Sequence, residues 1–348
     1  MSSSQTKRCV LITGGAGFIG FHAAKAFSES GWTVVILDNL SRRGTQTNAN
    51  ILQSRFGCHL VQCDIRNADE LSRHVKEVSP QAVLHLAGQV AVTTSVINPR
   101  EDFEINALGT LNVLEAVRLH SPDASLLYSS TNKVYGTMDS INVIERNGRY
   151  EYQDLIRGTQ EDFPLCFHSP YGCSKGAADQ YVLDYHRIFG LKTIVFRQSC
   201  IYGTHQFGIE DQGWVAWFSI AAALGKKITI YGDGMQIRDV LDVRDLVRAY
   251  LAAIERSDQV AGEAFNMGGG ASNTLSLLEL LDYIENARGI KIPTSFADWR
   301  LGDQRVFVCN IDKAQRLLNW SPEIRMQDGV LHLIEWVNAN PQLFTWLK

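Results

Sequence analysis

The chain has 348 residues, of which 45% are hydrophobic and 20% charged, and its formal net charge is −4. This composition is typical of a folded globular protein, and 33 basic against 37 acidic residues exclude a strongly basic surface for nucleic acid. No apolar run reaches the roughly 18 residues of a membrane span, and residues 1–8 lead directly into a strand-like segment, so we expect no signal peptide. The seven cysteines include no C-x-x-C pair. We therefore expect a cytoplasmic protein without disulfides or a metal site.

The first half of the chain alternates short apolar strands with helices. The predicted strands are residues 9–13, 33–37, 59–62, 82–86, 125–128 and 192–196. The predicted helices are residues 17–30, 69–77, 101–120 and 171–189. Because these strands are apolar on both faces, the order predicts an α/β fold, a Rossmann-type doubly wound parallel sheet with helices on both sides.

After residue 197 this alternation stops. Short strands are predicted at residues 228–231 and 264–267, among helices at 213–224, 243–255 and 274–287 and a helical pattern from Asp312 onward. We predict a first domain over residues 1–197 and a smaller mixed α/β C-terminal lobe over residues 198–348. Residues 139–168 contribute in part to this lobe, and some of its segments return to the first domain.

A glycine-rich turn joins the first strand to the first helix. Gly14, Gly17 and Gly20 follow the spacing G-x-x-G-x-x-G. Gly14 permits a sharp turn, Gly17 lets the backbone approach a pyrophosphate, and Gly20 lets the helix pack close to the sheet. The N-terminus of the helix supplies N–H donors to the anion. The turn predicts a dinucleotide site, and the alternative is a tight turn without a ligand.

Asp38 ends the second predicted strand and decides between two dinucleotides. A carboxylate at this place accepts hydrogen bonds from the ribose hydroxyls of NAD and repels the 2′-phosphate of NADP. Arg42 and Arg43 follow closely and are alternative anchors for that phosphate. We predict NAD, bound by residues 1–197. Further candidates lie in the glycine turn and after the next strands: Phe18, Ile19, Asn39, Asp64, Ile65, Leu86, Ala87, Gly88 and Gln89.

Tyr171 and Lys175 begin the last helix of the first domain. Their spacing of four residues places both on one helix face, one turn apart. A phenol has a reference pKa near 10, and a nearby ammonium favours the phenolate. Tyr171 is therefore a candidate general base, with Thr131 upstream at the end of a strand.

Together, the glycine turn, the segment S-S-T-x-x-V-Y-G at 129–136 and the Y-x-x-x-K pair resemble the extended short-chain dehydrogenase/reductase family. This family contains nucleotide-sugar epimerases and dehydratases. The resemblance implies that Thr131 hydrogen-bonds the reacting hydroxyl, Tyr171 removes its proton and Lys175 orients the nicotinamide ribose. Asn106 resembles an asparagine that supports this network, and a structural polar residue inside a helix is the alternative.

The two residues after Thr131 indicate which of the family's reactions a member catalyses. Members that dehydrate the sugar carry an Asp-Glu pair there, whereas this chain has Asn132 and Lys133. An amide and an ammonium do not replace the two carboxyl groups, so dehydration is disfavoured. Epimerisation at two carbons needs another acid/base pair, for which Cys200 and Lys133 are candidates, although a buried structural cysteine is the favoured interpretation of Cys200. Transient oxidation and re-reduction of one ring carbon needs no further acid. We therefore predict an NAD-dependent nucleotide-sugar epimerase.

Candidate substrate contacts follow from the same resemblance. Arg238 and Arg305 lie in polar turns at positions that resemble those gripping the sugar-nucleotide diphosphate. Salt bridges with Asp239 or Asp303 are the alternative. Residues 205–212 are expected to continue around the nucleotide. The predicted substrate-binding residues, beginning with those after the fifth strand, are Thr131, Asn132, Lys133, Gln198, Ser199, Arg238 and Arg305.

Segments around the predicted site resemble one subgroup of the family. Residues 132–133, 167–181, 196–203 and 211–218 resemble members that invert C2 of a CDP-activated dideoxyhexose. The chain departs from the family at Gly88, where many relatives have alanine, and at His205, where we expect a basic side chain. The alternatives are a UDP-hexose 4-epimerase, a dehydrogenase that releases NADH, and a non-catalytic dinucleotide-binding protein.

The resemblance also implies a homodimer or homotetramer. Relatives pair through two long helices that correspond to residues 101–120 and 171–189. The apolar residues Leu108, Leu111, Val113 and Leu114 provide surface for both a core and a partner face. The alternative is that all four face the sheet.

Overall fold

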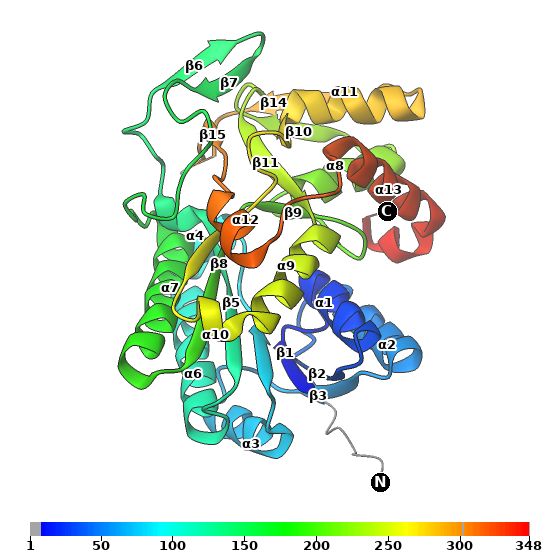
Figure 1. Cartoon of the computed structure of the whole chain (residues 1–348). Helices are drawn as coiled ribbons and strands as arrows, with labels where there is room; N and C mark the ends of the chain where they lie inside the picture. The colour runs from blue at the N-terminus through cyan, green and yellow to red at the C-terminus, as the bar shows by residue number, and fades with distance from the viewer. Residues whose placement is uncertain (1–7, 301–302, 348) are drawn as a thin grey trace.

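The computed structural model describes residues 8–300 and 303–347, so the segment in which we expect no signal peptide lies outside the described residues. Its centre is a seven-stranded sheet with the order β12-β8-β5-β4-β1-β2-β3. All neighbours in it pair in parallel. The strands are β1 (Cys9–Thr13), β2 (Thr33–Asp38), β3 (His59–Gln62), β4 (Ala82–His85), β5 (Ser125–Thr131), β8 (Lys192–Gln198) and β12 (Ala264–Met267). The predicted Rossmann-type sheet is confirmed (Figure 1).

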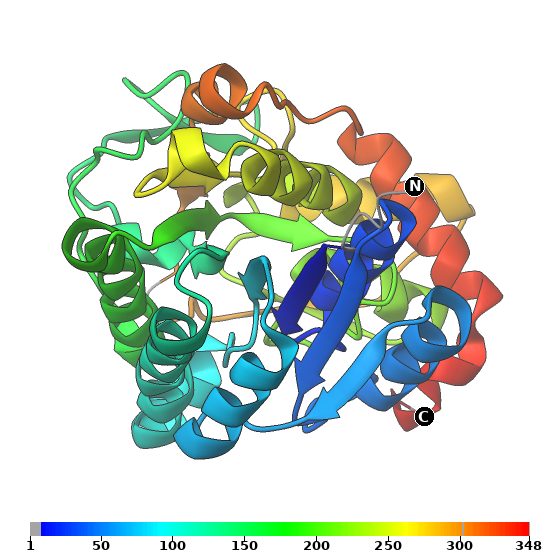
Figure 2. The same cartoon turned by 60° about the horizontal axis from the view of Figure 1, so that its bottom comes forward.

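Helices cover both faces of this sheet (Figures 1 and 2). On one face lie α1 (Phe18–Glu29), α2 (Thr45–Phe56) and α9 (Val243–Glu255), and on the other lie α3 (Ala68–Val78), α6 (Gly109–His120) and α7 (Ser169–Phe189). Strand β1 shows how the sequence builds these layers. Val10 and Ile12 pack in the first layer, whereas Leu11 between them packs in the second. Side chains of a strand alternate between faces, so apolar residues at every position fill both cores.

The carboxyl ends of the central strands meet at one edge of the sheet. Thr13 at the end of β1 pairs with Leu37 on β2 and with His85 on β4. Thr131 at the end of β5 pairs with Gln198 on β8. In open α/β sheets, ligands bind in the crevice outside these ends.

The C-terminal lobe has its own sheets and core. Strand β11 (Ile237–Asp242) pairs with β9 (Cys200–Tyr202), β13 (Thr274–Ser276) and β15 (Val306–Phe307), while β10 (Ile228–Tyr231) pairs with β14 (Thr294–Ala297). The helices of the chain from residue 214 onward, besides α9, are α8 (Trp214–Ala223), α10 (Ser257–Val260), α11 (Leu277–Arg288), α12 (Asp312–Leu318), α13 (Met326–Ala339) and a final 3₁₀ segment (Pro341–Leu347). Apolar residues of α8, α11 and α13 share one buried cluster.

A hairpin links the two parts of the molecule. Strands β6 (Val143–Arg146) and β7 (Arg149–Tyr152) pair in antiparallel and project at the top of Figure 1. Tyr152 at its base packs in one cluster with Val134 after β5 and with Phe307 on β15. Residues 139–168 thus contact the lobe. The division of the chain at residue 197 into two domains stays a prediction.

Two predicted helices differ from the structure. Residues 101–120 form three joined pieces, α5 (Pro99–Phe103), a π-helical turn (Glu104–Leu108) and α6. Residues 274–276 are strand β13, because the helix begins only after Ser276, whose hydroxyl caps it together with Glu279. Helix α2 was not predicted because its sequence is rich in polar residues and buries few apolar ones. The short α4 (Val92–Ile97) and the hairpin were not predicted either.

Within the described ranges, no helix is long and apolar enough to span a membrane.

Candidate active site

The glycine turn is shaped by close backbone contacts. Gly14 has a φ of +67°, and a side-chain carbon there would lie 2.7 Å from the backbone nitrogen of Ala87. A side-chain carbon on Gly20 would lie 2.2 Å from the carbonyl oxygen of Gly14. Gly17 is the N-cap of α1 and, as glycine, has no side chain to accept the first N–H groups of that helix. The turn therefore leaves free donors pointing out of the sheet edge, as an anion site requires.

Asp38 is held against this turn. Its carboxylate accepts hydrogen bonds from the backbone N–H of Ala16 at 3.1 Å and of Leu40 at 2.8 Å. Burial raises the pKa of Asp38, and these two hydrogen bonds and the nearby charge of Arg42 oppose the rise. The side chain is thus fixed beside the glycine turn, where the sequence analysis expects a ribose.

The other dinucleotide candidates surround the turn to different degrees. The backbone N–H of Ala87 donates to the Thr13 hydroxyl at 3.3 Å, which locks the segment after β4 onto the glycine turn. Asn39 donates to Asp64 at 2.9 Å, and the hydrogen bonds from Arg66 lower the pKa of Asp64 to about 2. Phe18 and Ile19 begin α1. Ile65 and Leu86 pack against the apolar layers. Their roles toward a dinucleotide stay predictions.

These residues fit NAD. A side chain at Gly14 would clash with the backbone of Ala87, so only glycine allows this tight turn, and no N-cap side chain occupies the N-terminus of α1. Asp38 suits two ribose hydroxyls. A side-chain carbon on Gly88 would lie 3.9 Å from the Lys175 nitrogen. As glycine, this residue places no side-chain atom between the backbone after β4 and the lysine.

Tyr171 and Lys175 lie in the first turns of α7 and are both buried. Burial raises the pKa of Tyr171 to about 12, and its contact with Thr131 and the charge of Arg42 lower it in part. Burial also lowers the pKa of Lys175 to about 7. The Lys175 nitrogen donates to the carbonyl oxygen of Ser129 at 2.5 Å and lies 4.3 Å from the centre of the Tyr128 ring. The three predicted catalytic residues, Thr131 included, thus meet where β5 and α7 approach each other.

Asn106 ties the segment after β4 to α7. It sits in the π-helical turn, and its side chain exchanges two hydrogen bonds with the backbone of Gln89, at 2.9 and 3.0 Å. It also donates to Asp102 and to Ser174, whose hydroxyl donates to Asp102 at 2.5 Å. Asp102 and Ser174 were missed by the sequence analysis. Ser174 stands beside Lys175 in the motif, and this neighbourhood is the signal that could have found it.

The residues after Thr131 face the C-terminal lobe. Lys133 donates to Gln304 at 3.4 Å, and Asn132 accepts a hydrogen bond from Thr131 at 3.4 Å. Burial and the nearby charge of Arg238 lower the pKa of Lys133 to about 8. Burial raises the pKa of Cys200, whose sulfur accepts a hydrogen bond from the Trp214 indole at 3.4 Å. Cys200 is therefore held as a neutral thiol.

The two predicted diphosphate arginines have different environments. Arg238 is buried and donates to Asp303 at 2.6 Å, so the ion pair considered as an alternative is present. Arg305 is exposed and lies 5.3 Å from the centre of the Tyr150 ring. The structure thus gives Arg238 a fixed direction and leaves Arg305 at the surface.

Gln198 and Ser199 are bonded within the protein. Gln198 donates to the Tyr250 hydroxyl at 2.7 Å, and Ser199 donates to Asp239 at 2.5 Å. Both side chains lie at the end of β8, and their contact with a substrate stays a prediction.

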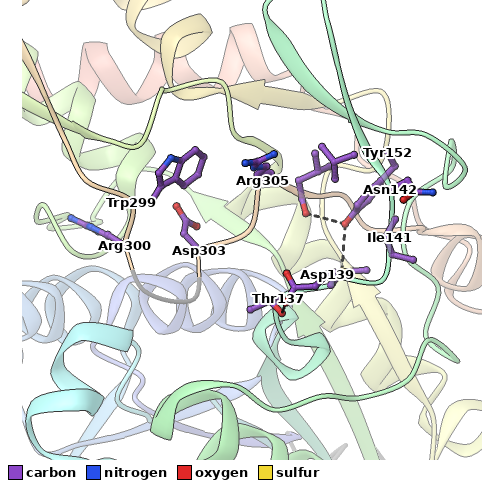
Figure 3. Close-up of a pocket in the computed structure, with 12 residues that line it drawn as sticks. Thr137, Asp139, Ile141, Asn142, Tyr152, Trp299, Arg300, Asp303 and Arg305 are labelled. Atoms are coloured by element: carbon purple, nitrogen blue, oxygen red, sulfur yellow. Dashed lines mark hydrogen bonds between the residues drawn. The ribbon is translucent and has the colours of Figure 1, made fainter.

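A cavity of about 490 Å³ lies beside Asp303 and Arg305 (Figure 3). Residues 137–139, 141–143 and Tyr152 line one side, and Trp299, Arg300, Asp303 and Arg305 line the other. Arg300 was missed by the sequence analysis. It pairs with Asp211 at 3.0 Å and lies 3.9 Å from the centre of the Tyr231 ring. The described residues contain no cluster of His, Cys, Asp and Glu that could hold a metal ion.

Comparison with known proteins places this geometry in context. Residues 10–268 match the NAD dependent epimerase/dehydratase family. The chain is 45% identical to the CDP-paratose 2-epimerase of Salmonella typhi, over 95% of this chain and 99% of that protein. It is similar to the UDP-glucose 4-epimerase of Thermotoga maritima solved with UDP-glucose, with a TM-score of 0.83 and 30% identity over 96% and 99% of the two chains. The Thermus thermophilus UDP-glucose 4-epimerase, solved with NAD, gives a TM-score of 0.80 and 30% identity over 94% and 98%.

Proposed function

The chain belongs to the NAD-dependent epimerase/dehydratase family and is an NAD-dependent nucleotide-sugar epimerase, and on this premise we propose that it inverts C2 of a CDP-activated dideoxyhexose. One observation carries the finer assignment: the chain is 45% identical to a CDP-paratose 2-epimerase over 95% of its length. The UDP-glucose 4-epimerase of known structure is 30% identical over 96%. The higher identity over the same span favours C2 inversion over C4 inversion.

The side chains after Thr131 agree with epimerisation. Asn132 and Lys133 occupy the positions where dehydration would need two carboxyl groups. The amide of Asn132 does not titrate near neutral pH, so only Lys133, whose pKa is lowered to about 8, could exchange a proton where dehydration would need two carboxyl groups. We propose that both residues orient the sugar.

Three residues carry the proton chemistry in this proposal. When bound, NAD supplies a hydride acceptor that also returns the hydride, and its nicotinamide ring is positively charged. Tyr171 takes the proton of the sugar hydroxyl and gives it back, and Thr131 donates or accepts a hydrogen bond at the same oxygen. Because burial holds the pKa of Tyr171 at about 12, the phenolate needs positive charge close by. Lys175, buried one helical turn away and with its pKa lowered to about 7, supplies part of that charge in its protonated form.

Arg238 and Arg305 are proposed to hold the diphosphate, with Arg238 fixed by Asp303. Both Arg305 and Asp303 line the cavity of about 490 Å³. This cavity offers space for part of a nucleotide beside Arg305 and Asp303.

A substrate panel tests this function. The purified protein is incubated with CDP-paratose, CDP-tyvelose, UDP-glucose and UDP-galactose, and the products are identified by NMR. We expect interconversion of the two CDP-sugars without accumulation of NADH at 340 nm. CDP-sugar deuterated at C2 should keep its label in the product. Conversion of the UDP-hexoses alone would assign a 4-epimerase, accumulation of NADH a dehydrogenase, and loss of deuterium to water a direct deprotonation at carbon.

We also propose that the protein forms a homodimer through its exposed helical face. Val113 and Leu114 are buried against the sheet, whereas Leu108 is 40% exposed. Further exposed apolar side chains on α5, α6 and α7 are Phe103, Leu119, Tyr181, Ile188 and Phe189. Exposed apolar side chains on neighbouring helices are typical of an interface. Sedimentation at micromolar concentration should give a dimer, and a monomer would contradict the proposal.

A further inference from the structure

The segment that follows Asp38 is contacted by four residues of the distant C-terminal lobe. Arg42 donates to the side-chain oxygen of Gln212. The guanidinium of Arg43 lies 3.9 Å from the centre of the Trp346 ring. A side-chain carbon on Gly44 would lie 2.2 Å from the ring of Phe207. The fourth contact joins Asn48 to His205 at 3.0 Å.

This segment, residues 42–48, adjoins the glycine turn. It begins four residues after Asp38, whose carboxylate accepts the backbone N–H of Ala16 in that turn. Its last residue, Asn48, donates to the carbonyl oxygen of the same Ala16 at 3.1 Å. The segment therefore lies beside the turn at which we propose that NAD binds.

His205 is the most constrained of the four lobe residues. Its φ of +60° lies in a region that side chains other than glycine seldom adopt. Its ring stacks on Phe21 of α1 at 3.8 Å and lies 5.1 Å from the Trp336 ring of α13. Burial lowers the pKa of His205 to about 3, so the ring is neutral near pH 7. Because Asn48 donates through its nitrogen to Ala16, its oxygen accepts the Nδ1–H of His205.

The C-terminus completes the arrangement. Trp346 lies in the last 3₁₀ segment, and Phe344 beside it packs against Trp336 and Phe207. In Figures 1 and 2 this red end of the chain lies on the same side of the molecule as the blue helix α2. Contacts of residues 42–48 thus come from two separate parts of the lobe, residues 205–212 and the C-terminal segment.

We infer that residues 42–48 are a clasp, closed by His205, Phe207, Gln212 and Trp346, that slows the release of NAD. The inference rests on the proposed function, in which one NAD serves many turnovers and never needs to leave. A hydrogen bond or a cation–π contact that must break before NAD leaves contributes to the barrier. The clasp therefore acts on cofactor retention and leaves the proton-transfer groups untouched.

The test measures NAD release from the intact protein. Full-length protein is loaded with isotopically labelled NAD and chased with excess unlabelled NAD, and the retained label is followed over time. His205→Phe keeps an aromatic ring beside Phe21 but removes the hydrogen bond to Asn48. Arg43→Met keeps the aliphatic stem and removes the charge over Trp346. We expect each variant to release NAD about threefold to tenfold faster, and the double variant faster still.

A matched control shows whether faster NAD release is specific to the clasp or follows from the loss of any cation–π contact. Arg8 lies 4.3 Å from the centre of the Trp32 ring at the start of β1, far along the strand from the glycine turn. Arg8→Met removes an equivalent cation–π contact, and we expect its NAD release to equal that of the wild type. If His205→Phe fails to fold, Gln212→Ala, which removes only the partner of Arg42, replaces it.

The outcomes are distinguishable. Wild-type release rates in all folded clasp variants would overturn the inference and leave the epimerase assignment intact. A wild-type protein that neither carries NAD after purification nor binds it in titration would instead contradict the proposed cofactor retention. Faster release in Arg8→Met as well would show that the effect is not specific to residues 42–48.

Discussion

The two sides of the candidate active site are formed by different chemical groups. The dinucleotide side consists of glycines, backbone N–H groups and one carboxylate, Asp38, all within one β-α-β unit. The proposed sugar side consists of charged and polar side chains, among them Lys133, Arg238 and Gln304, which come from three distant segments. The first side is fixed by the path of the backbone, the second by long side chains that pair with one another. A substitution on the first side should therefore change cofactor binding, and one on the second should change substrate binding.

Tyr171 lies between the two sides, and its substitution should have the largest effect. Tyr171→Phe keeps the ring and removes the phenol, so NAD content should be unchanged while turnover falls by about 10²–10⁴. Epimerisation followed by NMR and NAD released on denaturation are the two measurements. Thr131→Val, which removes one hydrogen bond and leaves the base, should be milder. Near-normal turnover in Tyr171→Phe would remove this residue from the chemistry.

Arg238 tests the sugar side alone. Arg238→Met should raise KM for the nucleotide sugar by about 10–100-fold, because a charge-assisted hydrogen bond is lost, with NAD content unchanged. Since Asp303 loses its partner as well, the melting temperature should also fall. Arg305→Met provides the comparison, since Arg305 is exposed and we expect a smaller effect on KM. Loss of NAD from Arg238→Met would contradict the separation of the two sides.

The buried groups should respond to acid in two directions. Burial lowers the pKa of His85 to about 3 and of His205 to about 3, below the 6.5 of an unfolded histidine. Between about pH 3 and 6.5 the unfolded chain therefore binds more protons than the folded one, so the free energy of unfolding falls as the pH falls through that window. Burial instead raises the pKa of Asp239, so acid favours the folded form there.

Unfolding by denaturant at different pH values measures the effect of the buried histidines on stability. Between pH 7.5 and pH 5 we expect each buried histidine to lower the free energy of unfolding by about 1–2 kcal/mol. In His205→Phe, the decrease in the free energy of unfolding between these two pH values should be smaller than in the wild type by that amount. An identical pH dependence in the two proteins would show that His205 does not contribute.

Asp38 should give the smallest of these effects. Asp38→Ser keeps a hydrogen-bond acceptor for Ala16 but removes the charge that disfavours a 2′-phosphate. We expect the preference for NAD over NADP to fall by about tenfold in titrations with each nucleotide, while KM for the sugar stays constant. A wild-type protein that binds NADP more tightly would overturn the role of Asp38.

The same contrast explains how much was predictable from the sequence. The glycine turn, Asp38 and the Tyr171–Lys175 pair follow local spacing, and the structure places them at one sheet edge as expected. Gln304 and Arg300 contact Gly136 and Asp211, which are far away in the sequence, and no local pattern encodes these contacts. Asp102 belongs to no recognisable motif, and its contacts with Gln89 and Ser174 arise only from the tertiary fold. The role of Arg305 toward the diphosphate stays a prediction, and its exposure depends on tertiary packing.

The position of strand β12 in the sequence has a consequence for folding during synthesis of the chain. It is synthesised some 66 residues after β8, by the difference between Ala264 and Gln198, yet it forms the edge of the sheet beside that strand. Until β12 has been synthesised, the N–H and C=O groups on the outer edge of β8 therefore have no partner strand. Such an edge readily accepts a strand from another molecule. A chain that stops between residues 198 and 263 carries Tyr171 on an open sheet. We expect such a truncated chain to aggregate rather than to persist as a free-standing NAD-binding unit.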